Sequence, residues 1–167
     1  MRNNPCDPPD AEVKDVKDPM RAPGSPVKAL ALGLVTDLGG TLVAGIVFDL
    51  LYRVLWWTQG LDAEQVRAAE HEHSLGSAYF VIGTLLGLYF SYLGGHVCAR
   101  VMRKSELLWG AVLAGLSMVL GAWSVLSIAP DTVDAWFVPV CILGVATTLA
   151  GALRGRAKNQ ADSQSAA

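Results

Sequence analysis

Charged residues are missing from long parts of this 167-residue chain. Residues 74–99 contain no Lys, Arg, Asp or Glu. As a helix this segment would be about 39 Å long, which exceeds the roughly 30 Å hydrocarbon core of a bilayer. A helix in a soluble core rarely runs so far without a charge. The absence therefore predicts a membrane span.

Other absences narrow the possible functions. The chain has only three cysteines, Cys6, Cys98 and Cys141, which lie far apart in the sequence. A small, odd number of widely separated cysteines argues against a disulfide framework and favours free thiols. The basic residues form no stripe of the kind that binds nucleic acid, so no nucleic-acid partner is expected. The chain has no nucleophile–base pair and no phosphate-binding loop, so we expect a non-enzymatic protein without a cofactor.

What is present is a set of four apolar segments in a chain that is 52% hydrophobic. Together they predict one transmembrane domain, residues 29–155, between tails at 1–28 and 156–167 that we expect to be disordered in the cytoplasm. Because the later connections are short, the predicted fold class is an all-α membrane protein with an up-down-up-down bundle of four transmembrane helices. The predicted spans are 29–55, 75–101, 107–129 and 135–153.

The loop between the first two spans has its own features. Asp62 is suited to the N-cap of a short helix that would lie on the membrane surface. The Glu70–His73 run suggests a metal site, but His71 and His73 point to different sides of a helix and no further ligand cluster accompanies them. We therefore expect a solvated loop and no metal site.

The distribution of Lys and Arg predicts the orientation. Eleven of the 13 lie in the N-terminal tail, the 100–104 loop and the C-terminal tail, and only Arg53 and Arg67 lie on the other side. Basic residues favour cytoplasmic loops, so both termini are expected in the cytoplasm. The first apolar run follows a polar leader and is too long for a signal peptide, so we expect it to remain as an anchor.

Small residues recur along every span at spacings that place them on one face. Such stripes let helix backbones approach closely, so we expect tight packing with few cavities. The Gly83–Gly87 pair could pack against another helix of the same chain or against a second copy in a homodimer. Because the other three spans also have small-residue faces that require packing partners, packing within the chain is favoured. The predicted helix-packing residues are Gly83, Gly87, Gly94, Gly110, Ser117, Gly121, Gly144 and Gly151.

Asp37 is the candidate polar site within the membrane. It lies on the small-residue face of the first span, roughly 10 Å from the cytoplasmic end by the helical rise. Acids at such depth are costly and often functional. Tyr92 and His96 of the antiparallel second span reach a similar depth and could join Asp37 in handling protons or cations. Alternatively, Asp37 bonds to a hydroxyl group that fixes helix register, or caps a helix break at Gly39–Gly40.

Three segments carry a resemblance. They are GGHVCARVMRKSELLWGAVLAGL at 94–116, TDLGGT at 36–41 and TQGLDAEQV at 58–66. Together they resemble a family of small four-span bacterial inner-membrane proteins, in which Gly-Gly and Ala-Arg close a span before a basic loop and Leu-Leu-x-Gly-Ala opens the next. The resemblance implies a multi-pass protein of the bacterial inner membrane. It implies no activity, because the family has no assigned reaction.

Two functional interpretations follow. The first is a structural or accessory membrane protein that assembles with itself or with a larger membrane partner in the lipid bilayer. The second is a small proton- or cation-coupled transporter or channel-like subunit that uses Asp37. A path through the bundle lined by polar side chains would favour the transporter, but the spans contain few polar residues besides Asp37. The sequence therefore favours the first.

Overall fold

The structure is a computed structural model that describes residues 24–62, 64–65, 78–128 and 136–165. Its elements are α1 (Pro26–Leu34), η2 (Val35–Gly39), α2 (Gly40–Thr58), α4 (Ala78–Met102), α5 (Glu106–Ile128) and α6 (Phe137–Ser165). The first three form one continuous helix, in which η2 is a single π-helical turn. Proline at the start of α1 suits the first position of a helix, where no backbone N–H is needed.

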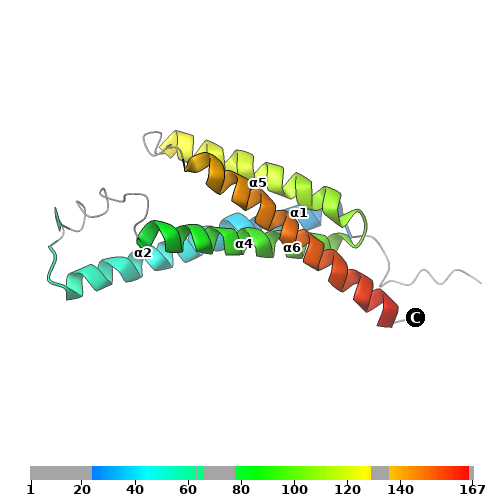
Figure 1. The fold of residues 1–167 in the computed structure, drawn as a ribbon, viewed down its shortest axis with the longest axis horizontal. Helices are drawn as coiled ribbons and strands as arrows, with labels where there is room; N and C mark the ends of the chain where they lie inside the picture. Colours follow the sequence, from blue (N-terminus) through cyan, green and yellow to red (C-terminus); the bar gives the residue numbers. More distant parts are fainter. Residues whose placement is uncertain (1–23, 63, 66–77, 129–135, 166–167) are drawn as a thin grey trace, which may run out of the picture.

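Consecutive helices run in opposite directions, as Figure 1 shows. Four of the described helices are long and apolar enough to cross a membrane. The predicted fold class, an all-α up-down-up-down membrane bundle, is confirmed.

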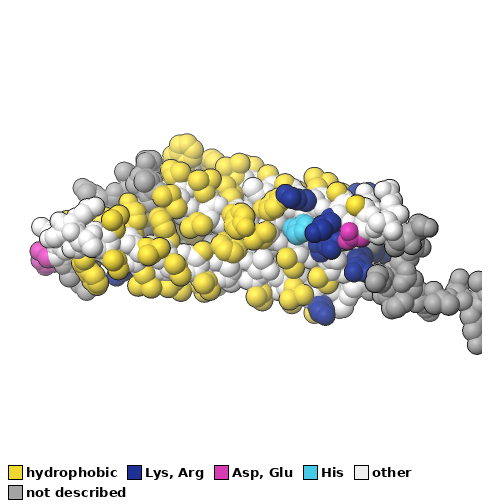
Figure 2. Space-filling model, turned by 90° about the horizontal axis from the view of Figure 1, so that it is seen from below, with side chains coloured by type: hydrophobic (Ala, Val, Ile, Leu, Met, Phe, Trp, Pro, Cys, Tyr) yellow, Lys and Arg dark blue, Asp and Glu magenta, His cyan; other side chains and the backbone are white. Residues whose placement is uncertain are grey.

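Large apolar side chains cover the outside of the helices. Leu42, Val119 and Ile142 belong to three different helices, and each is more than 60% exposed. Figure 2 shows hydrophobic side chains over the middle of the molecule and Lys and Arg gathered at the end where the C-terminus lies. A lipid bilayer would cover such a surface, because apolar patches of this extent are not left in water.

One end of the bundle is tightly packed. The backbones of α4 and α6 touch where Gly95 meets the carbonyl of Thr148 and Gly151 meets the carbonyl of Tyr92. Around this contact, α1, α4 and α5 bury a small apolar core of Ala29, Cys98, Met102 and Leu113. The chain just before α1 also contacts the end of α4, because the backbone N–H of Gly24 donates to the carbonyl of Met102.

The C-terminal tail is helical where disorder was predicted. Residues 156–167 were expected to be disordered, but α6 continues through Ser165. Its extension is tied to the other helices by side-chain hydrogen bonds. Asn159 donates to the carbonyl of Ala99 at 2.9 Å and to the carboxylate of Glu106 at 3.4 Å. Arg100 donates to Asn159 at 3.2 Å and to Asp162 at 2.6 Å.

The loop after α2 begins with a capping box. Asp62 accepts the backbone N–H groups of Glu64 and Gln65, and the Gln65 side chain accepts the N–H of Asp62. The predicted N-cap at Asp62 is therefore confirmed. The remainder of the predicted interfacial helix, the Glu70–His73 run and residues 1–23 lie outside the described residues.

The hydrogen bonds of Asn159 lead to a first prediction. Replacing Asn159 by Ala removes the bonds to Ala99 and Glu106, so the free energy of unfolding should fall by roughly 1–2 kcal/mol. Gln160→Ala is the matched control, because Gln160 is exposed and should change stability by no more than about 0.5 kcal/mol. Thermal unfolding of the full chain in detergent measures both. Equal stability of the two variants would contradict the role of Asn159.

An intramembrane cavity with a buried aspartate

The half of the bundle away from the described chain ends contains a cavity of about 860 Å³. Its walls come from η2, α2, α4, α5 and α6, and its inner end lies beside Asp37 and Thr148. Aromatic side chains of Phe80, Trp136 and Phe137 line the opposite end. Tight packing along the whole bundle was expected, but the helix pairs that touch at one end separate toward the other and leave this cavity between them (Figure 1).

The predicted packing residues divide into two groups. Gly94, Gly110 and Gly151 contact other helices: a Cβ atom on Gly94 would lie 2.8 Å from the carbonyl of Gly33, and one on Gly110 would lie 2.6 Å from Ala152. The other group lines the cavity, and its members are Gly83, Gly87, Ser117, Gly121 and Gly144. For Gly83, Gly121 and Gly144 the prediction of packing against a helix is wrong, because a Cβ atom there would meet no described neighbour.

The cavity-lining glycines have open space beside them. A Cβ atom on Gly83, Gly121 or Gly144 would meet nothing within 4 Å among the described residues, and one on Gly87 would lie 3.9 Å from Thr41. Missing side chains at these positions therefore create volume in the cavity. Glycine therefore allows close helix contact at one end of the bundle and leaves empty space at the other.

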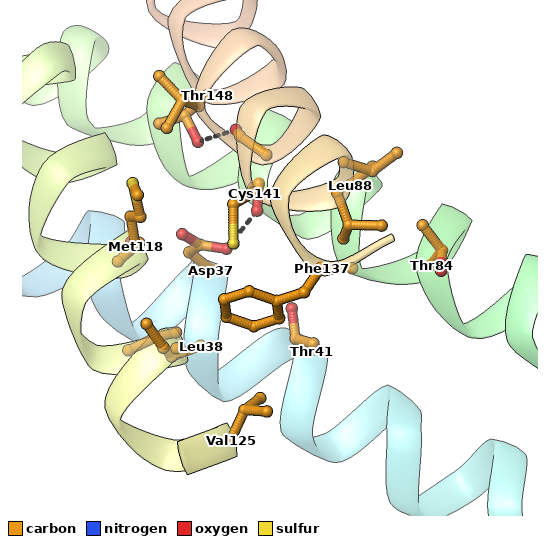
Figure 3. Close-up of a pocket in the computed structure, with 18 of the residues that line it drawn as sticks. Asp37, Leu38, Thr41, Thr84, Leu88, Met118, Val125, Phe137, Cys141 and Thr148 are labelled. Carbon is orange, nitrogen blue, oxygen red and sulfur yellow. Dashed lines mark hydrogen bonds between the residues drawn. The ribbon is translucent and has the colours of Figure 1, made fainter. Parts of the chain in front are cut away.

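Asp37 is the charged residue of this site. It lies in the π-helical turn η2 and is only 3% exposed. One carboxylate oxygen, Oδ1, accepts a hydrogen bond from the Ser91 hydroxyl group at 2.8 Å. The other, Oδ2, is buried and has no hydrogen-bond partner among the described residues. Figure 3 shows the carboxyl group directed into the space between the helices, which it shares with Cys141.

The π-helical turn replaces the helix break that was considered at Gly39–Gly40. The chain passes through both glycines without leaving the helix, and Gly40 packs against the ring of Phe90. Single π-turns within α-helices are rare and often occur at functional sites. Asp37 thus occupies a local irregularity of a helix that is otherwise regular.

Tyr92 and His96 do not join Asp37, so the predicted three-residue site is wrong. Both lie on the side of α4 that faces α6, where the hydroxyl group of Tyr92 accepts a hydrogen bond from Arg154 at 3.0 Å. The partner of Asp37 is Ser91, which was not among the predicted site residues. A signal was present: Gly87, Ser91, Gly94 and Cys98 repeat the same spacing as the small residues around Asp37.

The chemistry of the cavity follows from its lining. Among the described residues that line it, Asp37 is the only one with a carboxyl or basic group, and most others are apolar, small or hydroxyl-bearing. No three His, Cys, Asp or Glu side chains gather as metal ligands in the described part of the chain. The arrangement suits a ligand with an apolar body and one cationic or hydrogen-bond-donating group.

Comparisons with models of protein families, with curated proteins and with solved structures find no match to this chain. Function is therefore inferred from the geometry of the cavity.

The two roles of glycine lead to a second prediction, tested on one helix. Gly144→Ala should raise the free energy of unfolding by roughly 0.5–1 kcal/mol, because alanine is the better helix former and the cavity leaves room for a methyl group. Gly151→Ala should lower it by about 1–3 kcal/mol, because the methyl group would strike the carbonyl of Tyr92.

Thermal unfolding in detergent, with both variants prepared identically, measures this difference in sign. A loss of stability in both variants would show that Gly144 also packs against a neighbouring helix.

Proposed function

We propose that this protein is a non-enzymatic membrane protein that binds a lipophilic cation in the cavity and holds it with Asp37. The observation that carries this proposal is the buried carboxylate oxygen Oδ2 of Asp37, which has no hydrogen-bond partner among the described residues while the group borders a cavity of about 860 Å³. A buried charge without a partner is costly, so a cation beside it would recover that cost. The volume lies in the range of sites for drug-sized ligands.

The walls support a ligand that is largely apolar. Phe80, Trp136 and Phe137 could stack on aromatic parts of the ligand or on its charge, since aromatic faces attract cations. Small residues deeper in the cavity would leave space for its bulk. A small hydrated ion is less suitable, because apolar side chains make up most of the walls and cannot replace its water shell.

The packing of the bundle suggests binding from one side. The contacts of Gly33 with Gly94 and of Gly95 with Thr148 leave no space between these helices at the end that holds the described chain ends. A ligand would therefore enter from the other half or from the surrounding lipid. Passage across the membrane would require these contacts to open, as in a carrier that exposes its binding site first to one side of the membrane and then to the other.

We also propose that the protein resides in a bacterial inner membrane with both termini in the cytoplasm. The uneven distribution of Lys and Arg supports the orientation, and so does their clustering beside the C-terminal end of α6 (Figure 2). The resemblance of residues 94–116 to small four-span bacterial proteins supports the proposed location in a bacterial inner membrane.

An accessory subunit of a larger assembly, or a homo-oligomer, is the second candidate. The observation in its favour is that no residue of α2 is buried, although the helix is 19 residues long. Its exposed residues include Val43 and Leu51, which are 62% and 64% exposed. A partner helix in the membrane could cover this surface in place of lipid.

A third prediction tests cation binding with tetraphenylphosphonium as the probe. Asp37→Asn keeps the size of the side chain and a carbonyl acceptor for Ser91 but removes the charge. Its affinity for the probe should fall by about thirtyfold or more, since losing one partner of a buried charge pair costs at least about 2 kcal/mol. Equilibrium dialysis with the full chain in detergent measures the affinity.

Two controls accompany this measurement. Asp49→Asn removes an acid of α2 that pairs with Arg53 at 3.0 Å and does not line the cavity, so it should bind the probe as the wild type does. Tetraphenylborate has the same shape with a negative charge and should bind the wild type much more weakly. Equal affinity of wild type and Asp37→Asn for tetraphenylphosphonium would reject the proposed function and leave the accessory role.

A fourth prediction tests orientation. Alkaline phosphatase fused after Leu61 should be active in a bacterial host, because this enzyme folds only outside the cytoplasm, and the same enzyme fused after Ser165 should be inactive. Green fluorescent protein at Ser165 should be fluorescent. An active phosphatase at Ser165 would reverse the proposed orientation.

A further inference from the structure

The α4–α6 pair has a second face that the cavity does not use. On α4, Tyr92 and His96 follow one another by one helical turn, and on α6, Arg154 and Lys158 do the same. Arg154 joins the two helices by its hydrogen bond to the hydroxyl group of Tyr92. His96 lies within the electrostatic influence of Arg100 on its own helix and of Lys158 and Arg154 on α6. None of these residues lines the cavity.

Arg154 and Lys158 form no ion pair with any described residue, although the Asp162 carboxylate lies within electrostatic reach of Lys158. The one described hydrogen bond of the Arg154 side chain goes to the neutral hydroxyl group of Tyr92. The nearby carboxylate of Asp162 bonds to Arg100. The hydroxyl group of Tyr92 accepts from Arg154 and keeps its own hydrogen free to donate. Such a cluster offers an anion two cations and further donors.

An apolar track continues from the cluster toward the middle of the membrane. Leu85 and Tyr89 precede Tyr92 at helical spacing on α4 and are 60% and 56% exposed. On α6, Leu143 lies eleven residues before Arg154, which places both on one side of the helix, and it is half exposed. Figure 2 shows basic side chains and a histidine where the hydrophobic surface ends.

We propose that Arg154 and Lys158, with Tyr92 and His96, bind the phosphate group of an anionic membrane phospholipid, whose acyl chains lie along Leu85, Tyr89 and Leu143. The cationic cluster matches the charge of the headgroup, and the adjoining apolar track matches its chains. Basic pockets between helices at one membrane surface are a known means of holding anionic lipid headgroups. A soluble phosphate would use the cluster and leave the apolar track without a role.

The test measures how phosphatidylglycerol stabilises the full chain in detergent, as the concentration that gives half of the maximal rise in melting temperature. Arg154→Gln/Lys158→Gln should require about thirtyfold more lipid, since each cation near a lipid surface contributes about fivefold in affinity. Arg156→Gln/Lys104→Gln removes the same charge from exposed positions outside the cluster and should stay within about threefold of the wild type.

A single variant keeps the test valid if the double variant does not fold. Lys158→Gln removes a side chain that bonds to no described residue, and it should require about fivefold more lipid, whereas Lys104→Gln should not. Phosphatidylcholine, which has no net charge, should stabilise the wild type less than phosphatidylglycerol does.

Two results would overturn the proposal. Equal losses in the cluster variants and their matched controls would indicate general attraction to a charged surface. Equal stabilisation by inorganic phosphate and by phosphatidylglycerol at the same concentration would identify a soluble anion as the ligand. Neither result would bear on Asp37, so this site and the cation site are tested separately.

Discussion

The direct contact between the backbones of α4 and α6 is the constraint on which the rest of the structure depends. Gly95 of α4 and Gly151 of α6 each lie against a carbonyl group of the other helix, so even one methyl group at either position would force the helices apart. Lipid tails are as apolar as leucine side chains, so helices in a membrane associate through such close packing. Once these two helices touch, α1 and α5 can pack beside them around Cys98 and Leu113, and the extension of α6 reaches Ala99 and Glu106.

The same contact explains the cavity. Helices that touch at one end and are not parallel must separate toward the other, and the side chains there decide whether the space is filled. Gly121 and Gly144 line this space and leave it open. Asp37 lies where the packed half meets the open half, so its carboxylate is shielded from water on one side and borders free volume on the other. That position makes an unpaired carboxylate oxygen relevant to binding.

Two faces of one helix pair therefore have different chemistry. Toward α2 and α5, α4 and α6 present hydroxyl groups, small residues and the surroundings of Asp37. Away from the cavity they present Tyr92, Arg154 and Lys158, none of which lines it. A lipid on the second face would lie across α4 and α6, the two helices whose backbone contact closes one end of the cavity. Lipid could then stabilise the closed end of the bundle, because both sites depend on the α4–α6 contact.

Much of the fold was predictable from the sequence, because four apolar runs long enough to span a bilayer leave few alternatives and the capping residue at Asp62 acts locally. Asp37 was also recognisable as an acid at an unusual depth. Only the tertiary structure decided which small residues touch and which leave a cavity, because that depends on the angle between helices and on no single helix. It also decided that Ser91 and not the adjacent Tyr92 meets Asp37, since neighbouring positions on α4 differ by about 100° in direction. The helical course of α6 through Ser165 was likewise a tertiary result, because Asn159 and Asp162 acquire their partners only when α4 lies beside them.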